Sequence, residues 1–409
     1  MKLKILFFFF VMILLSSCHK QKSPNKILTI ENLQDSLLVF DFESAISNST
    51  EASNALLNNI ADTIRFIKLE TTPRTLLSNI NFHFYPWNNS YIVSSGVGNQ
   101  FSGVLTFDNK GNFERVLLDI GNGPNELGKG NYEWFVDETA QELIVVGRGR
   151  ALAYSLQNQT SKYIQTKRYC FNLLPMGNKC YASILDLFTY SGETDVPYLY
   201  LFDKNGKTEK EFYYPQKRDI SYTLKEGTNE WPYETYALSM GRNKRVLFKD
   251  VFNDTIYTIQ NNVLKPYWYF HTGKMTAKVK DAHNIEKKAA CIYFEKKSSE
   301  SAGLVFANYA YNRMYNCSVW EKQTEKLIIN TIVDTNDQTT STSMVNNSHF
   351  IRYRTPNGKI VLLGISLVCD NTLYAIIKAK DAMEFLPGID EESNPVVMEV
   401  KLTNQSTNI

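Results

Sequence analysis

The sequence lacks the signals of several common protein classes. Its apolar N-terminal run, Ile5–Leu15, has eleven residues, whereas a membrane-spanning helix needs about 20. There is no Cys-x-x-Cys, His-Glu-x-x-His or Gly-x-Ser-x-Gly pattern, so the usual signatures of zinc, thiol-redox and serine-hydrolase sites are absent. A surplus of charge is lacking too: without residues 1–17, 42 Lys and Arg stand against 42 Asp and Glu. We therefore expect no nucleic-acid partner, because phosphate binding requires a basic surplus.

What the N-terminus does contain is the pattern of a bacterial lipoprotein signal. Lys2 and Lys4 precede the apolar run, which has the length of a signal-peptide core. Leu15-Ser16-Ser17-Cys18 follows, with small side chains before a cysteine whose thiol accepts a diacylglycerol. The sequence predicts a signal peptide over residues 1–17 and a membrane anchor at Cys18. A plain secretory signal with an incidental cysteine is the alternative. Residues 18–61 are largely polar and are predicted to tether the domain.

Beyond the tether, composition and turn chemistry favour β-strands. Aromatic residues make up 13% of the chain, with 24 Tyr and 24 Phe, and such residues suit strands. Five segments place an apolar strand end before a polar turn, most clearly Phe107–Gly111 and Phe202–Gly206. Asp and Asn tolerate left-handed backbone and Gly adopts it freely, so each segment predicts a hairpin. The strand ends stand at positions 107, 156, 202, 259 and 320, a spacing that fits blades of about four strands each.

We therefore expect an all-β fold: a six-bladed β-propeller with four-stranded antiparallel blades over residues 62–409. The sixth blade is divided between the chain ends, so the strand within 62–70 pairs with the strand within 394–402 and closes the ring. Residues 272–300 and 379–394 are interpreted as insertions. A pair of β-sandwiches or an irregular solenoid is the alternative. We expect a monomeric domain.

Three segments carry a resemblance to a protein family. They are Leu69-Glu70-Thr71-Thr72, the Phe107–Gly111 hairpin, and Ile120-Gly121-Asn122-Gly123-Pro124-Asn125-Glu126. In this order they resemble the six-bladed β-propeller lipoproteins of Bacteroidota-type bacteria, a largely uncharacterised family. The resemblance implies a propeller fold and a cell-envelope location. Surface export in such bacteria is expected to need an acidic cluster after the lipidated cysteine, and none follows Cys18. We therefore expect an outer-membrane lipoprotein that faces the periplasm.

Five residues are candidates for ligand binding. Glu126 ends a glycine-rich stretch that leads into a strand rather than a helix, which indicates a blade crossing rather than a phosphate-binding loop; a carboxylate that points to the ring axis would be a ligand group. Arg148 and Arg150 have guanidinium groups, which recognise carboxylates and phosphates through paired hydrogen bonds. Solvated surface arginines are the simpler interpretation. Trp231 and Tyr233 stand in a loop-like setting suited to stacking on a sugar ring. The other tryptophans are expected to pack between blades.

No catalytic residue, metal ligand or cofactor is predicted. The histidines of the predicted propeller are dispersed without a ligand spacing, at positions 83, 271, 283 and 349. Five cysteines follow Cys18, an odd number. Cys170 and Cys180 are either a cross-strand disulfide or two buried thiols.

These observations favour a non-enzymatic envelope lipoprotein that binds a glycan, a peptide or a protein partner through one propeller face. The alternative is a propeller enzyme, such as a polysaccharide lyase or glycoside hydrolase with an axial active site. A scaffold for a membrane transporter complex is a third hypothesis.

Overall fold

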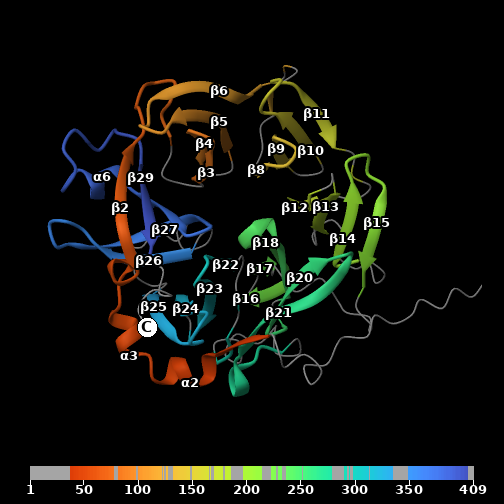
Figure 1. The fold of residues 1–409 in the computed structure, drawn as a ribbon, viewed down its shortest axis with the longest axis vertical. Coiled ribbons are helices and arrows are strands. Elements are labelled where there is room, and N and C mark those ends of the chain that lie inside the picture. The colour runs from red at the N-terminus through yellow and green to blue at the C-terminus, as the bar shows by residue number, and fades with distance from the viewer. Residues whose placement is uncertain are drawn as a thin grey trace, which may run out of the picture.

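Six small β-sheets stand around a common centre in the computed structural model (Figure 1). The structure describes residues 37–77, 82–97, 100–121, 123, 126–127, 132–147, 150–164, 166, 170–177, 180–185, 197–213, 223–226, 229–232, 236–250, 252–278, 290–292, 294, 298–312, 314–334 and 349–403. Neighbouring strands within each sheet follow one another in the chain and run antiparallel, with few exceptions. The fold is the predicted six-bladed β-propeller.

The blades follow the chain from blade 1 to blade 6. Blade 1 contains β3 (His83–Trp87), β4 (Ser90–Val97), β5 (Gln100–Asp108), β6 (Phe113–Ile120) and β7 (Glu126–Leu127). Blade 2 contains β8 (Tyr132–Asp137), β9 (Glu142–Gly147), β10 (Arg150–Ser155) and β11 (Ser161–Ile164). Blade 3 contains β12 (Cys170–Pro175), β13 (Cys180–Leu185), β14 (Leu199–Asp203) and β15 (Thr208–Phe212), and a separate hairpin follows it, β16 (Thr223–Glu226) with β17 (Asn229–Pro232).

The second half of the ring has the same plan. Blade 4 contains β18 (Tyr236–Met240), β19 (Val246–Asp250), β20 (Thr255–Gln260), β21 (Val263–His271) and β1 (Leu38–Asp41). Blade 5 contains β22 (Ser299–Glu300), β23 (Leu304–Tyr311), β24 (Met314–Glu321) and β25 (Leu327–Asp334). Blade 6 contains β26 (His349–Arg354), β27 (Ile360–Cys369), β28 (Thr372–Ile377), β29 (Val396–Leu402) and β2 (Ala61–Lys68). The short helical elements are α2 (Phe42–Ser47), α3 (Thr50–Asn54), η2 (Leu57–Asn59), η3 (Arg242–Lys244), η4 (Gly273–Met275) and α6 (Ala379–Ala382).

The prediction of four strands per blade holds for three blades. Blades 1 and 4 each gain a parallel outer strand, β7 and β1. Blade 6 has five strands because β26 adds to its β27 edge. β27 lies against β3 and β22, the first strands of the neighbouring blades, and extends toward the centre of the ring in Figure 1. It is therefore the inner strand of blade 6.

The ring closes as predicted. β2 pairs antiparallel with β29, with Ile64 opposite Val400 and Phe66 opposite Met398. The Arg65 guanidinium donates to Glu399 Oε2 at 2.7 Å and to the Tyr91 hydroxyl of blade 1 at 2.6 Å. The outer strand of blade 6 is thus fastened to its own sheet and to blade 1.

The predicted hairpins are the turns between the third and fourth strands of blades 1 to 5. In blade 1, Asp108 Oδ1 accepts hydrogen bonds from the backbone N–H groups of Lys110 and Asn112 at 2.8 and 2.9 Å. Asp203 accepts the same pair of bonds in blade 3. The glycines that complete these turns, Gly111 and Gly206, have φ of 93° and 79°. The two turns repeat one design because the same residue types stand at the same positions.

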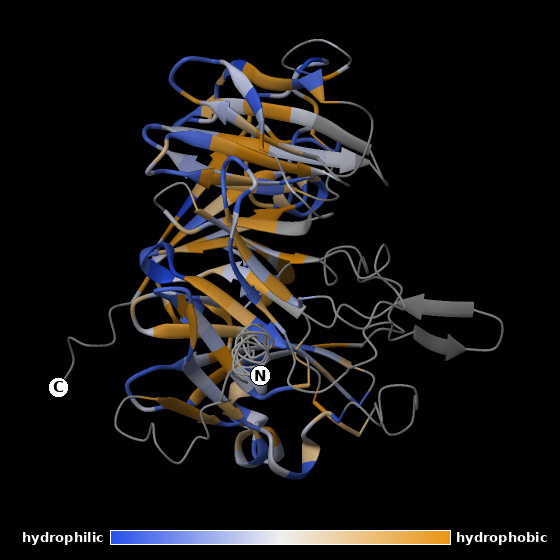
Figure 2. Cartoon of the chain, turned by 90° about the vertical axis from the view of Figure 1, so that its right-hand side faces the viewer, coloured by the Kyte–Doolittle hydropathy of each residue, from blue (hydrophilic) through white to orange (hydrophobic). Residues whose placement is uncertain are grey.

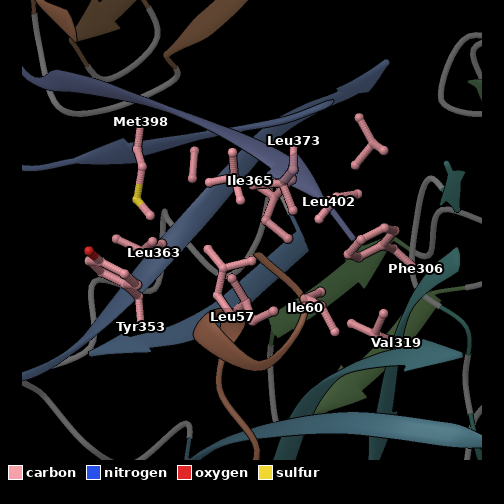
Figure 3. Close-up of a cluster of buried hydrophobic side chains, with 14 of the residues drawn as sticks. Leu57, Ile60, Phe306, Val319, Tyr353, Leu363, Ile365, Leu373, Met398 and Leu402 are labelled. Atoms are coloured by element: carbon pink, nitrogen blue, oxygen red, sulfur yellow. The ribbon is translucent and has the colours of Figure 1, made fainter. Parts of the chain in front are cut away.

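Hydrophobic cores fill the wedges between blades. One cluster lies between blades 5 and 6 and includes Phe306, Val319, Ile365, Leu373 and Met398 (Figure 3). In Figure 2 the hydrophobic segments run through the middle of the strands, and the hydrophilic ones lie mainly at their ends. Trp134, Trp268 and Trp320 are buried in such clusters, which confirms the packing role expected for them. Cys180 is a free thiol, so the structure does not contain a Cys170–Cys180 disulfide.

The N-terminal boundary of the folded domain differs from the prediction. Residues 37–60, assigned to the tether from their polar composition, form β1, α2, α3 and η2 along the rim of blades 4, 5 and 6. Phe40 and Phe42 are fully buried, and the Phe42 ring lies 4.6 to 5.4 Å from those of Phe270, Phe294, Tyr309 and Trp320. Phe40 and Phe42, together with the buried Leu57 and Ile60, therefore fix this segment against the propeller.

Candidate functional site

The two ends of the blades carry connections of different length. Because the strands alternate in direction, the turns after the first and third strands share one end of each sheet. In blades 1 to 5 these turns are residues 88–89, 109–112, 138–141, 156–160, 176–179, 204–207, 241–245, 261–262, 301–303 and 322–326, and blade 6 adds 370–371. We call this side the short-turn face. The opposite side, the long-connection face, is the end of the sheets at which β13, β15 and β21 end, and 13 residues separate β13 from β14 and 27 separate β21 from β22.

Side chains from four blades meet near the axis on the short-turn face. Glu138, in the first turn of blade 2, accepts a hydrogen bond from the Tyr85 hydroxyl of β3 at 2.5 Å. Its other carboxylate oxygen lies 2.7 Å from Lys244 Nζ, in the first turn of blade 4. Cys369 and Asp370, where β27 of blade 6 ends, are close enough to interact electrostatically with this group. Since blade 3 separates blades 2 and 4, these side chains meet where the inner strands converge.

The charges in this group compensate one another. Burial alone raises the pKa of the Glu138 carboxyl, but hydrogen bonds from Lys244 and Tyr85 outweigh it and leave the pKa below its usual value. Burial, with Glu138 beside it, raises the pKa of Tyr85. Burial and the neighbouring Asp370 raise the pKa of the Cys369 thiol to about 11. At neutral pH the group therefore contains a carboxylate, a phenol and a thiol, an arrangement suited to holding blades together rather than to proton transfer.

A second polar group on the short-turn face joins blades 4 and 5. The Glu300 carboxylate at the end of β22 is fully buried and forms an ion pair with Lys322. It also accepts hydrogen bonds from the Tyr267 hydroxyl at 3.1 Å and from the Arg242 backbone N–H at 2.9 Å. The Arg245 guanidinium covers the Tyr267 ring at 4.4 Å. A buried charge with this many partners links two blades.

On the long-connection face, one buried lysine organises a turn. Lys249 Nζ donates to the carbonyl oxygens of Asp250, at 2.6 Å, and of Asn253, and it lies 4.9 Å from the Phe294 ring centroid. Burial lowers the pKa of Lys249 to about 8, although Asp250 and Asp254 oppose the shift. Its contacts with backbone carbonyls are those of a structural group.

The structure describes three of the predicted site residues, and only one of these, Glu126, with its side chain. Glu126 is exposed in β7, and its Oε2 accepts the Gly123 backbone N–H at 2.6 Å, so this carboxylate closes its own loop beside the outer strand β6. Arg150 begins β10 and Trp231 lies in β17, but their side chains are outside the described residues. Cys18, Arg148 and Tyr233 are outside them entirely. A ligand role for these residues stays a prediction.

Sequence reasoning missed the Tyr85–Glu138–Lys244 group. The available signal was the position of Glu138 and Lys244 in the turns that follow inner strands, which places them at the same end of the ring. Nothing in the residue types indicates that blades 2 and 4 meet.

The described part of the chain has neither a metal centre nor a membrane-spanning helix. No three of its His, Cys, Asp or Glu side chains are grouped to hold a metal ion. None of its helices is long and apolar enough to span a bilayer.

Comparisons with known proteins agree with the fold. Of the solved structures that are similar, a "putative exported protein" of Bacteroides fragilis has 15% sequence identity and a TM-score of 0.63, and the match covers 90% of this chain and all of that one. A member of the DUF4221 family from Bacteroides vulgatus has 10% identity and a TM-score of 0.47, covering 87% of this chain and 99% of that one. No curated protein matches. A family model described as a domain of unknown function, DUF4934, matches residues 37–401. The chain belongs to this family.

Proposed function

We propose that this protein is a cell-envelope lipoprotein, anchored through Cys18, that binds a glycan, a peptide or a protein partner on its long-connection face. The observation that carries the proposal is the unequal length of the connections. No turn of the short-turn face exceeds five residues, whereas at the opposite end 23 residues separate β15 from β18 and 27 separate β21 from β22. Binding residues stand preferentially on loops that a rigid scaffold positions.

The polar groups of the short-turn face support the choice of the opposite face for binding. On the short-turn face, Glu138 and Lys244 are paired with each other, and Glu300 and Lys322 likewise, so their hydrogen-bonding capacity serves the ring. The similar structure described as exported supports an envelope location, as does the lipoprotein signal at residues 1–18. Within the described residues, no group of titratable side chains favours the enzyme alternative.

The anchor is tested by mass spectrometry of the protein produced in a bacterium that processes lipoproteins. We expect an N-terminal peptide that begins at a diacylated Cys18, and loss of the modification in Cys18→Ser. Recovery of an unmodified Cys18 in the wild-type protein would contradict the anchor.

Binding is tested with the full-length protein carrying a photo-crosslinking amino acid on either face. Lys278 stands on the long-connection face, and Gln323 is its exposed counterpart on the short-turn face. Exposure to envelope extracts and to a glycan array should give products from position 278 but not from 323. Products from 323 alone, or turnover of an array glycan, would overturn the binding assignment.

A further inference from the structure

The first described segment of the chain packs on a propeller that is complete without it. This segment, residues 37–47, contains β1 and α2, and we call it the strap. Blade 4 already has four antiparallel strands, β18 to β21, before β1 is added at the outer edge of β21. The closure of the propeller depends on β2 and β29 instead. The strap is therefore an addition to the fold, at the outside of blade 4 (Figure 1).

The strap inserts two phenylalanine side chains between blades 4 and 5. The Phe42 ring has four aromatic neighbours at centroid distances of 4.6 to 5.4 Å. The Phe40 ring lies 5.5 Å from that of Trp320 and 5.7 Å from that of Phe270. We call the surrounding residues the aromatic slot, and they are Trp268, Phe270, Phe294, Tyr309 and Trp320. All but Phe294 stand on strands β21, β23 and β24, so the blades themselves fix the shape of the slot.

The propeller holds the strap in the way that many domains hold an extended peptide. The backbone of β1 pairs with β21 along the whole length of β1, and the Val39 N–H donates to Glu325 Oε1 of blade 5 at 3.2 Å. The side chains of β1 alternate, with Phe40 buried and Val39 and Asp41 exposed. Backbone pairing at a sheet edge supplies affinity in such complexes, and pockets for alternate side chains supply specificity.

Acidic side chains of the strap add polar contacts at the end of the slot. Asp41 Oδ1 accepts the Ser44 backbone N–H at 3.0 Å and so caps the start of α2. Glu43 Oε1 accepts the Lys274 backbone N–H at 3.3 Å, and Glu43 Oε2 lies 3.8 Å from His271 Nε2. The contacts therefore match a segment in which two phenylalanines, two positions apart, are separated and followed by acids.

We propose that the aromatic slot is a peptide-binding site whose ligand is the strap of the same chain, and that the propeller keeps the strap bound after the chain between them is cut. The class of ligand is an extended acidic segment with a Phe-x-Phe pair. This inference goes beyond the binding role proposed for the long-connection face, and it does not depend on a lipid at Cys18. The N-terminal part of the chain is then joined to the propeller by the slot as well as by the polypeptide.

A protease recognition sequence between Asn48 and Ser49, directly after α2, tests the proposal in the full-length protein. After cleavage, the fragment that ends at residue 48 should stay with the propeller in size-exclusion chromatography. Phe42→Ala should release at least about tenfold more fragment. Val39→Ala, at an exposed position of the same segment, should release no more than the wild-type protein. Complete release of the wild-type fragment, or equal release from both variants, would overturn the proposal.

The uncut full-length protein supplies a second test. Phe40→Ala with Phe42→Ala empties the slot, and urea unfolding of this variant should remain one cooperative transition. A fluorescent peptide of residues 37–48 should bind the variant at least about tenfold more tightly than it binds the wild-type protein, whose own strap fills the slot. Loss of the cooperative transition would show that the strap belongs to the core of the fold. That result would overturn the proposal, as would equal binding of the peptide to both proteins.

Discussion

Glu138 and Lys244 form an ion pair at 2.7 Å although they belong to blades 2 and 4, with a whole blade between them in the chain. Each stands in the turn that follows the inner strand of its blade. The pair therefore spans the inner side of blade 3, and Tyr85 extends it to blade 1. Most contacts in a propeller join neighbouring blades, but the Glu138–Lys244 pair joins blades 2 and 4, which are not neighbours.

Glu138→Gln should weaken the ring modestly. The side chains are 35% and 54% exposed, so solvent screening limits the loss in unfolding free energy to about 1 kcal/mol. Urea unfolding of the wild-type and variant proteins measures it. Glu142→Gln, which removes a longer 3.7 Å pair with Lys162 inside blade 2, is the control and should cost about half as much or less. A larger loss in the control would show that the position of the Glu138–Lys244 pair across the ring adds nothing to the unfolding free energy.

Lys322→Met should be much more costly because it leaves the fully buried Glu300 without its cation. We expect a loss of about 3 kcal/mol in unfolding free energy. Lys326→Met, an exposed change in the same turn, should stay within ~0.5 kcal/mol. Adding Glu300→Gln to Lys322→Met should recover part of the loss, since a neutral amide needs no counter-charge. No recovery would mean that packing of the Lys322 stem, rather than charge, carries the effect.

Gly111→Ala and Gly358→Ala separate backbone strain from steric conflict. Both glycines have left-handed φ, 93° and 89°, so alanine is strained at either position. A Cβ on Gly111 would lie 2.0 Å from the Lys68 carbonyl oxygen, whereas nothing lies within 4 Å of one on Gly358. We expect losses of about 1 kcal/mol for Gly358→Ala and ~3 kcal/mol for Gly111→Ala. Thermal and urea unfolding of both variants test this. Equal losses would show that the steric contact with β2 adds nothing to the backbone strain.

His349 should make the fold sensitive to acid. Burial lowers the pKa of His349 to about 4 from an ordinary value of 6.5, and Nδ1 is 2.9 Å from Asn308 Oδ1. The unfolded chain binds the proton more tightly than the folded one. The contribution of neutral His349 to the unfolding free energy is therefore fully present above pH ~6.5, and about 3 kcal/mol of it is lost as the pH falls toward 4.

Unfolding free energies measured from pH 7 to pH 4 in wild type and His349→Gln test the assignment. The variant should lose most of this decline, and His271→Gln, a change at a half-exposed histidine, should retain it. A decline of equal size in all three proteins would assign the acid sensitivity to other groups.

The hairpins and the ring closure could be predicted because they depend on local chemistry. Asp108 and Asp203 fold their turns through bonds to residues two and four positions ahead, so the signal lies within five residues of sequence. The closing strands were recognisable because their apolar side chains alternate and because a ring needs its last blade completed.

The rest could not be predicted because it depends on contacts distant in sequence. Phe42 meets Trp320, and Glu138 meets Lys244, and no composition or spacing indicates such partners. Twelve of the 24 residues in 37–60 are hydrophobic, but only contacts distant in sequence show that Phe40, Phe42 and Leu57 are buried. Glu126 is a ligand candidate only if its carboxylate points to the axis, and its bond to Gly123 depends on the exact path of the loop.

The pairing of β2 with β29 sets the order in which the molecule can be completed. Arg65 and Glu399, which meet across that pairing, are 334 positions apart. In the described part of the chain β29 is the only strand that pairs with β2, so β2 has no partner strand until nearly all of the polypeptide has been synthesised. Such a distant encounter is slow to form. A chain that ends before residue 396 would lack β29, so β2 would have no partner strand and the ring would stay open.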